Sequence, residues 1–181
     1  MKANKWLILA IAAMLVISLV AAGCGKQEGG AGGDSAAETI KIGINYELSG
    51  EVAAYGATAK DAIMLAFEEI NAAGGVDGKM IEPIVLDNKS DATEALSVAT
   101  KLITQEKVVA HLGPATTGAT LNVVPVVTEY KIPLITNSAT NPDVTVDPQS
   151  KETREYVFRT CFIDPPQAVV GAEFAVNELG K

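Results

Sequence analysis

Cysteine, histidine and positive charge are scarce in this chain of 181 residues. It has two cysteines, Cys24 and Cys161, and a single histidine, His111. Two cysteines cannot form a framework of several disulfides, and one histidine without a cysteine at metal-ligand spacing does not make a zinc site. Acidic residues outnumber basic ones by 22 to 14, and this negative balance argues against nucleic acid as a partner.

Recognisable catalytic motifs are also missing. The sequence has no Gly-x-Ser-x-Gly elbow and no phosphate-binding glycine loop. Asp87, Asp91 and Glu94 could suggest a metal site, but Asp91 followed three residues later by Glu94 fits a helix-capping box. His111 follows an apolar strand, which favours a packed or hydrogen-bonded imidazole over a ligand or base. We therefore expect no catalytic residue, no metal and no cofactor.

The first 24 residues have the pattern of an export signal. Lys2 and Lys5 precede an apolar run over residues 6–22 that only Ser18 interrupts. The run ends in Val20-Ala21-Ala22-Gly23-Cys24, which resembles the cleavage box of bacterial lipoproteins. That resemblance implies a signal peptide over residues 1–23 and a lipid on Cys24; an uncleaved membrane helix is the alternative. Either would tether the chain on the outer face of a membrane.

Removal of residues 1–23 would leave 12 basic and 22 acidic residues, a formal charge of −10. A lipid on Cys24 would leave Cys161 without a disulfide partner in the chain, and we expect Cys161 to be a buried strand thiol. Residues 24–38 are rich in glycine, alanine and charge and have no apolar period, so they predict a flexible linker.

From Thr39 onward, short β-rich runs alternate with helical ones, which is typical of an α/β fold with a doubly wound parallel sheet. Pro83 cannot donate a ladder hydrogen bond, so its strand belongs at an edge, as the second strand does in the order 2-1-3-4-5. Asp164 is expected to cap the last helix. The expected strands cover residues 40–44, 81–87, 108–110, 132–136 and 156–161, and the expected helices cover residues 57–72, 92–103, 117–130 and 164–179.

Four ordered motifs resemble one known family. They are Glu69-Ile-Asn-Ala-Ala-Gly-Gly-Val-Asp-Gly-Lys79, Gly113-Pro-Ala-Thr-Thr117, Pro133-Leu-Ile-Thr-Asn-Ser-Ala-Thr140, and Phe158-Arg-Thr160 with Asp164 and Gln167. Together they resemble the branched-chain amino-acid binding family of type I periplasmic binding proteins, the receptors of ABC importers. The resemblance implies two α/β lobes with the ligand in the cleft between them. It implies an N-terminal lobe over residues 39–163 and, over residues 164–181, the start of a truncated second lobe.

Ligands of open α/β sheets bind beyond the carboxyl ends of the strands, which here means the loops at residues 49–55, 113–117 and 137–140. Backbone N–H groups and the Thr117 hydroxyl can face an anion at a helix N-terminus, so we assign a ligand carboxylate to Thr117, helped by Thr140. By resemblance, the Ser138 carbonyl and the Thr140 hydroxyl accept from the ligand ammonium. Tyr55 resembles the aromatic residue that lines the side-chain pocket, and Ser49 is a further candidate. Each hydroxyl could instead be only a helix cap or a turn residue.

The leading hypothesis is an extracytoplasmic receptor, anchored to the cell membrane through Cys24, that captures a branched-chain or related amino acid and delivers it to an ABC permease. The alternative is the ligand-sensing domain of a receptor or regulator for amino acids, amides or urea. An enzyme is disfavoured. With one wall of the cleft missing, we expect the chain alone to bind weakly or not at all.

Overall fold

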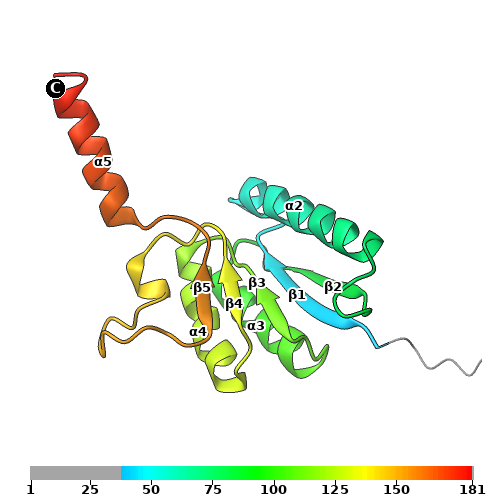
Figure 1. The fold of residues 1–181 in the computed structure, drawn as a ribbon. Helices are drawn as coiled ribbons and strands as arrows, with labels where there is room; N and C mark the ends of the chain where they lie inside the picture. Colours follow the sequence, from blue (N-terminus) through cyan, green and yellow to red (C-terminus); the bar gives the residue numbers. More distant parts are fainter. Residues whose placement is uncertain (1–37, 181) are drawn as a thin grey trace, which may run out of the picture. The chain divides into compact units, whose positions relative to one another are not determined.

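The computed structural model describes residues 38–180, in which strands and helices alternate along the chain (Figure 1). The predicted signal peptide, Cys24 and all but the last residue of the predicted linker lie outside the described residues. None of the described helices is long and apolar enough to span a membrane. The elements are β1 (Ile40–Tyr46), α2 (Ala53–Ala72), β2 (Ile81–Asp87), α3 (Ala92–Thr104), β3 (Ala110–Leu112), α4 (Thr117–Tyr130), β4 (Leu134–Thr136), the 3-10 helix η1 (Pro142–Val144), β5 (Val157–Arg159) and α5 (Asp164–Asn177).

All five strands form one parallel sheet in the order β2-β1-β3-β4-β5. This confirms the predicted doubly wound α/β fold and the position of β2 at an edge. Pro83 pairs with Ile42 of β1, and its missing N–H group is tolerated because β2 has a neighbour on one side only.

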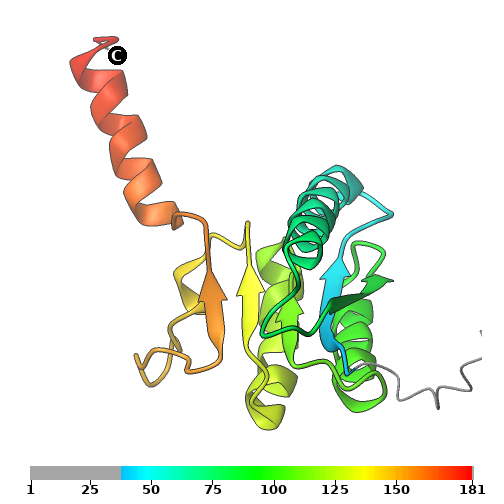
Figure 2. The same cartoon turned by 45° about the vertical axis from the view of Figure 1, so that its right-hand side comes forward.

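Helices cover the two faces of the sheet unequally (Figures 1 and 2). On one face α3 and α4 pack against each other, and their buried side chains form the larger apolar core with Leu134 and Val157. On the other face α2 packs over β1 and β2, around Ile44 and Phe67. Among the described residues, no helix covers that second face over β3, β4 and β5.

One row of apolar residues across the sheet becomes more exposed toward β5, where no described helix covers this face. Ile44, Leu112, Ile135 and Phe158 occupy paired positions on neighbouring strands, on the face that carries α2. Ile44 is fully buried, Leu112 is partly buried, Ile135 is 37% exposed and Phe158 is 49% exposed. Parallel sheets normally bury both faces, so this apolar row departs from the usual pattern where it becomes exposed over β4 and β5.

Most element boundaries lie within a few residues of the predicted ones. The first helix begins at Ala53, four residues before the predicted start, and β3, β4 and β5 are each three residues long. Asp91 is confirmed as the cap of α3, because its side chain accepts the N–H of Glu94 at 2.7 Å. Gly74, with a φ of 106°, lies just beyond the end of the first helix, where the left-handed region suits glycine.

Two local predictions are wrong. Asp164 does not cap α5: it is the first helical residue, the N-cap is Ile163, and no side chain caps the helix. Its carboxylate still lies in the first turn, where the helix dipole favours negative charge. Cys161 is not a buried strand thiol: β5 ends at Arg159, and Cys161 is a half-buried free cysteine in the bend that follows.

Candidate ligand-binding site at the carboxyl ends of the strands

Three loops that are far apart in the sequence meet at the carboxyl ends of β1, β3 and β4. Because the strands are parallel and adjacent, the chain leaves each of them at the same edge of the sheet. The Tyr46 hydroxyl donates to Asn137 Oδ1 at 3.1 Å and so joins the end of β1 to the loop after β4. Arg159 donates to the carbonyl of Asn141 at 2.7 Å and to that of Ala139 at 3.2 Å, which holds the same loop from the side of β5.

A hollow of about 300 Å³ lies where these loops meet. It brings together three of the five predicted ligand-binding residues: Tyr55, Thr117 and Ser138. Thr117 and Ser138 are partly buried, and no hydrogen bond among residues 38–180 occupies the Thr117 hydroxyl. The hollow is lined by Val52, Tyr55, Ala115, Thr116, Thr117 and Ser138.

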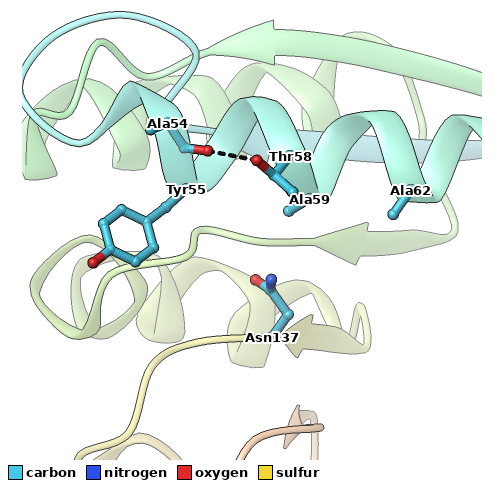
Figure 3. A pocket seen from close by; sticks show the side chains of 6 residues that line it. All are labelled: Ala54, Tyr55, Thr58, Ala59, Ala62 and Asn137. Atoms are coloured by element: carbon cyan, nitrogen blue, oxygen red, sulfur yellow. Dashed lines mark hydrogen bonds between the residues drawn. The ribbon is translucent and has the colours of Figure 1, made fainter.

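A second hollow, of about 460 Å³, adjoins the first along α2 (Figure 3). Tyr55 lines both hollows and is 64% exposed, so the two hollows share this residue. The side of the second hollow formed by α2 is built from small residues one turn apart, including Ala54, Thr58 and Ala62. Asn137 faces them from the loop after β4, and the Thr58 hydroxyl donates to the Ala54 carbonyl at 2.8 Å. The surface is therefore mainly apolar.

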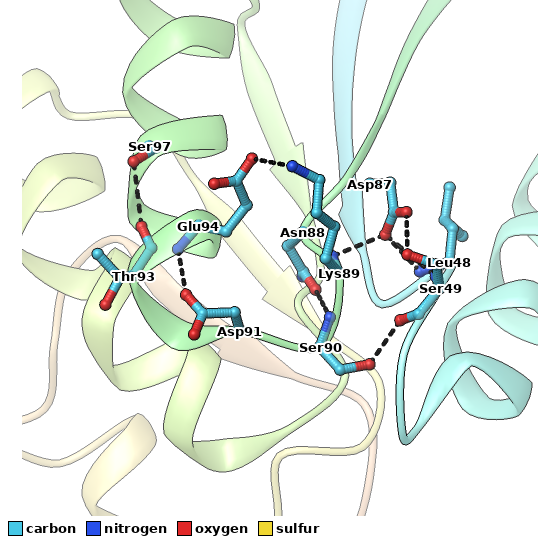
Figure 4. A network of polar contacts seen from close by, with 10 residues as sticks. All are labelled: Leu48, Ser49, Asp87, Asn88, Lys89, Ser90, Asp91, Thr93, Glu94 and Ser97. Atoms are coloured by element: carbon cyan, nitrogen blue, oxygen red, sulfur yellow. Dashed lines mark hydrogen bonds and ion pairs between the residues drawn. The ribbon is translucent and has the colours of Figure 1, made fainter.

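Ser49 and Thr140, the other two predicted residues, line neither hollow. The Ser49 hydroxyl donates to Asp87 Oδ2 at 2.6 Å, and Asp87 Oδ1 accepts the N–H groups of Ser49 and Lys89 (Figure 4). Burial by itself raises the pKa of Asp87, but the hydrogen bonds to Asp87 together outweigh burial and lower the pKa below its usual range. Ser49 thus joins β1 to β2. Thr140 is partly buried, and its carbonyl accepts from the N–H of Asp164 at 3.2 Å.

Sequence reasoning missed Glu47, which is fully buried at the end of β1. Its Oε2 accepts the N–H of Ala115 at 3.0 Å, and its Oε1 accepts the N–H and the hydroxyl of Thr116 at 3.1 and 2.8 Å. Two N–H groups of the turn that leads into α4 are therefore already bonded to the protein's own carboxylate. The available signal was a lone acidic residue directly after the buried run Ile44-Asn45-Tyr46.

A buried polar network lies behind these loops. Asn45 Nδ2 donates to the Ala95 carbonyl at 2.9 Å and contacts His111 Nε2 at 3.3 Å, while Asn88 donates to Asn45 Oδ1 at 3.1 Å. His111 Nδ1 lies 3.1 Å from the carbonyl of Gly113. Burial lowers the pKa of His111 to about 4, so its imidazole is neutral at pH 7. His111 is a hydrogen-bonded core residue that supports the loop after β3.

The arrangement suits noncovalent binding of a small polar ligand. Hydroxyl and backbone groups converge on the first hollow, and an aromatic ring and small apolar side chains line the second. In the part of the chain that the structure describes, no group of three His, Cys, Asp or Glu residues is placed to hold a metal ion.

Comparisons with known proteins agree on one family. The family model described as "Periplasmic binding protein" matches residues 39–181. The leucine-, isoleucine-, valine-, threonine- and alanine-binding protein of Pseudomonas aeruginosa is 33% identical over 141 residues, 77% of this chain and 36% of the relative. The Leu/Ile/Val-binding protein BraC3 of Rhizobium johnstonii is 33% identical over 140 residues, with the same coverage.

Solved structures show the same relationship. The branched-chain amino acid transporter substrate-binding protein LivJ of Streptococcus pneumoniae, in complex with isoleucine, has a TM-score of 0.74 and 45% identity over 79% of this chain and 39% of that one. The leucine-binding protein LivK of Thermotoga maritima has a TM-score of 0.70 and 35% identity, over 78% of this chain and 38% of that one. The chain therefore spans little more than a third of the length of these relatives.

Proposed function

Because the chain belongs to the periplasmic binding protein family and is similar to branched-chain amino acid receptors, we propose that it forms one ligand-binding lobe of an extracytoplasmic receptor of an ABC importer. The receptor captures a branched-chain or related amino acid and delivers it unchanged to a membrane permease. The observation that carries this proposal is the meeting of Tyr55, Thr117 and Ser138 in one hollow at the carboxyl ends of the strands.

Each residue contributes a different kind of contact. The Thr117 N–H and hydroxyl bind the ligand carboxylate at the start of α4, where the helix dipole favours an anion. The Ser138 carbonyl accepts from the ammonium group, and we assign the Thr140 hydroxyl to the same group, although Thr140 lines neither hollow. The Tyr55 ring packs against the aliphatic side chain, and the apolar surface of α2 extends that contact. Ser49 contributes indirectly, because its hydrogen bond to Asp87 holds the loop after β1 against β2.

The opposite wall of the cleft belongs to a second lobe, which begins at residues 164–181. Two observations support this division. No residue of α5 is buried, although Val170, Phe174 and Val176 are large apolar residues on it, and Figure 2 shows α5 projecting beyond the sheet. The exposed row that ends at Ile135 and Phe158 likewise needs a cover that residues 38–180 do not supply.

The membrane tether completes the proposal. A signal peptide over residues 1–23 exports the chain, a lipid on Cys24 anchors it to the outer face of the cell membrane, and the linker to residue 38 lets the lobe reach the permease. Mass spectrometry of the mature protein from its native membrane tests this step: we expect a diacylglyceryl group on Cys24 and no residue before it. An intact N-terminus would contradict the anchor.

Calorimetric titration of the complete protein tests the binding function. Among amino acids, amides and urea, we expect leucine, isoleucine or valine to bind most tightly. NMR spectra of the ligand after incubation with the protein should show that it is chemically unchanged. Thr117→Val keeps the shape of the side chain and removes the hydroxyl, which should weaken binding by about tenfold or more, because hydrogen bonds to charged groups contribute about 1.5–3 kcal/mol.

Thr100→Val is the matched control. Thr100 is exposed on α3, and its hydroxyl donates to the Leu96 carbonyl, away from both hollows. We expect this variant to bind as the wild type does. Equal affinities for the wild type and Thr117→Val would refute the carboxylate site, and an absence of binding to any branched-chain amino acid would refute the receptor function.

A further inference from the structure

Glu47 places a negative charge directly beside the candidate site. Its side chain has no exposed surface, and both of its carboxylate oxygens accept N–H donors. The two residues that donate, Ala115 and Thr116, both line the first hollow. The charge is thus separated from the hollow by one hydrogen-bonded turn of the chain.

No cation neutralises this charge within residues 38–180. The ion pairs among these residues join other carboxylates to lysine or arginine, and the Arg159 side chain donates to carbonyls and to the Thr145 hydroxyl instead. Among the described residues, the groups that stabilise Glu47 are N–H groups, a hydroxyl and the N-terminal end of α4. A buried charge that is balanced by dipoles alone still repels a second anion nearby.

The backbone of Glu47 is fixed as firmly as its side chain. A Cβ at Gly56, in the first turns of α2, would lie only 2.1 Å from the Glu47 carbonyl oxygen, so helix and strand are in close contact at this point. Ala115 is 2% exposed and packs within the same core as Tyr46. Close packing thus positions the backbone at Glu47, and three hydrogen bonds hold its carboxylate against the turn.

We propose that Glu47 is a specificity-determining residue, whose fixed charge beside the hollow makes the site select ligands that carry an ammonium group together with a carboxylate over ligands that carry a carboxylate alone. The inference rests on the proposed amino-acid site. The repulsion acts on every ligand carboxylate, but in a zwitterion the attraction of Glu47 for the ammonium offsets much of it. A simple anion has no such offset.

The test compares two probes on the complete protein by calorimetry. One is L-leucine, L-isoleucine or L-valine, whichever binds most tightly, and the other is the 2-hydroxy acid with the same carbon skeleton. The measured quantity is the selectivity, defined as the Kd of the hydroxy acid divided by the Kd of the amino acid. Glu47→Gln removes the charge and should lower this ratio about tenfold, equivalent to about 1.4 kcal/mol.

Two further variants separate charge from support of the loop. Glu47→Asp keeps the charge and shortens the side chain, so both affinities should fall while the ratio stays near the wild-type value. Asp91→Asn alters a carboxylate that caps α3, away from both hollows, and should leave both affinities unchanged. If Glu47→Gln weakens both probes by the same factor, Glu47 only supports the loop and the inference is wrong.

The outcomes also separate this inference from the proposed function. Wild-type protein that binds no branched-chain amino acid overturns both, whereas binding with an unchanged ratio in Glu47→Gln overturns the inference alone. If Glu47→Gln does not fold, Thr116→Val replaces it. That variant removes the hydroxyl that donates to Glu47 Oε1, leaves the charge less neutralised and should raise the ratio at least twofold. An unchanged or lower ratio would then refute the role of Glu47.

Discussion

Protonation of His111 is expected to destabilise the protein as the pH falls from 6.5 to 4. Its Nδ1 lies 3.1 Å from the Gly113 carbonyl, which can only accept, so Nδ1 carries the proton of the neutral ring. Nε2 therefore accepts from the Asn45 amide at 3.3 Å. A second proton on Nε2 would face the N–H donor of Asn45, so this hydrogen bond would be lost. The added positive charge would also be buried, because His111 has no exposed surface.

The size of the effect follows from the two pKa values. Burial lowers the pKa of His111 to about 4 in the folded state, against 6.5 for an unperturbed histidine. Between these values the unfolded state binds more protons than the folded state, so stability rises with pH. The contribution is complete above pH 6.5 and is lost as the pH falls to 4. A difference of about 2.5 pKa units at 1.36 kcal/mol per unit gives about 3 kcal/mol.

Urea unfolding of the wild type and His111→Gln between pH 4 and pH 7 measures this contribution. A glutamine amide can still donate to the Gly113 carbonyl and accept from Asn45, but it does not titrate in this range. Effects of other groups cancel in the difference between the two proteins, which should change by about 3 kcal/mol across the window. Parallel stability profiles, or an imidazole that titrates near pH 6.5 by NMR, would refute the argument.

The remaining predictions concern two glycine positions and a helix cap. Gly113→Ala should lower the free energy of unfolding by about 2 kcal/mol or more in urea melts, because Gly113 has a φ of 85° and an added Cβ would lie 2.2 Å from the Asn45 carbonyl oxygen. Gly118→Ala is its control: this helical site has open space, so we expect stabilisation by about 0.5–1 kcal/mol, and equal losses in both variants would contradict the reasoning. Asp91→Ala should cost about 1 kcal/mol in the same assay through loss of the α3 cap, and an unchanged midpoint would show that the bond to the Glu94 N–H adds nothing.

Local signals in the sequence predicted most of the fold correctly. The positions of Pro83 and Asp91 determine an edge strand and a helix cap through chemistry that operates within one or two residues. Cys161 was mispredicted because β5 is only three residues long and pairs with a β4 of the same length, which a run of apolar letters does not reveal. Asp164 was mispredicted because α5 begins one residue earlier than expected, so that Ile163 is the N-cap.

The candidate site was predictable in part. Tyr55, Thr117 and Ser138 follow strands whose parallel order was itself predictable, so their approach to one another follows from topology. The separation of Ser49 and Thr140 from both hollows was not predictable. It depends on which partner each group finds in space, and Ser49 finds Asp87, 38 residues away.

Periodicity, proline and helix capping act over a few residues, so the order of strands and helices, the edge strand and the loops that carry the polar residues were all predictable from local patterns. Which of those loops share a hollow, and where the charge beside it lies, depends on contacts between residues far apart in the chain. Glu47 is the clearest case: its partners are 68 and 69 residues away, and its carboxylate can bind the turn that precedes α4 only when the parallel sheet brings the ends of β1 and β3 together.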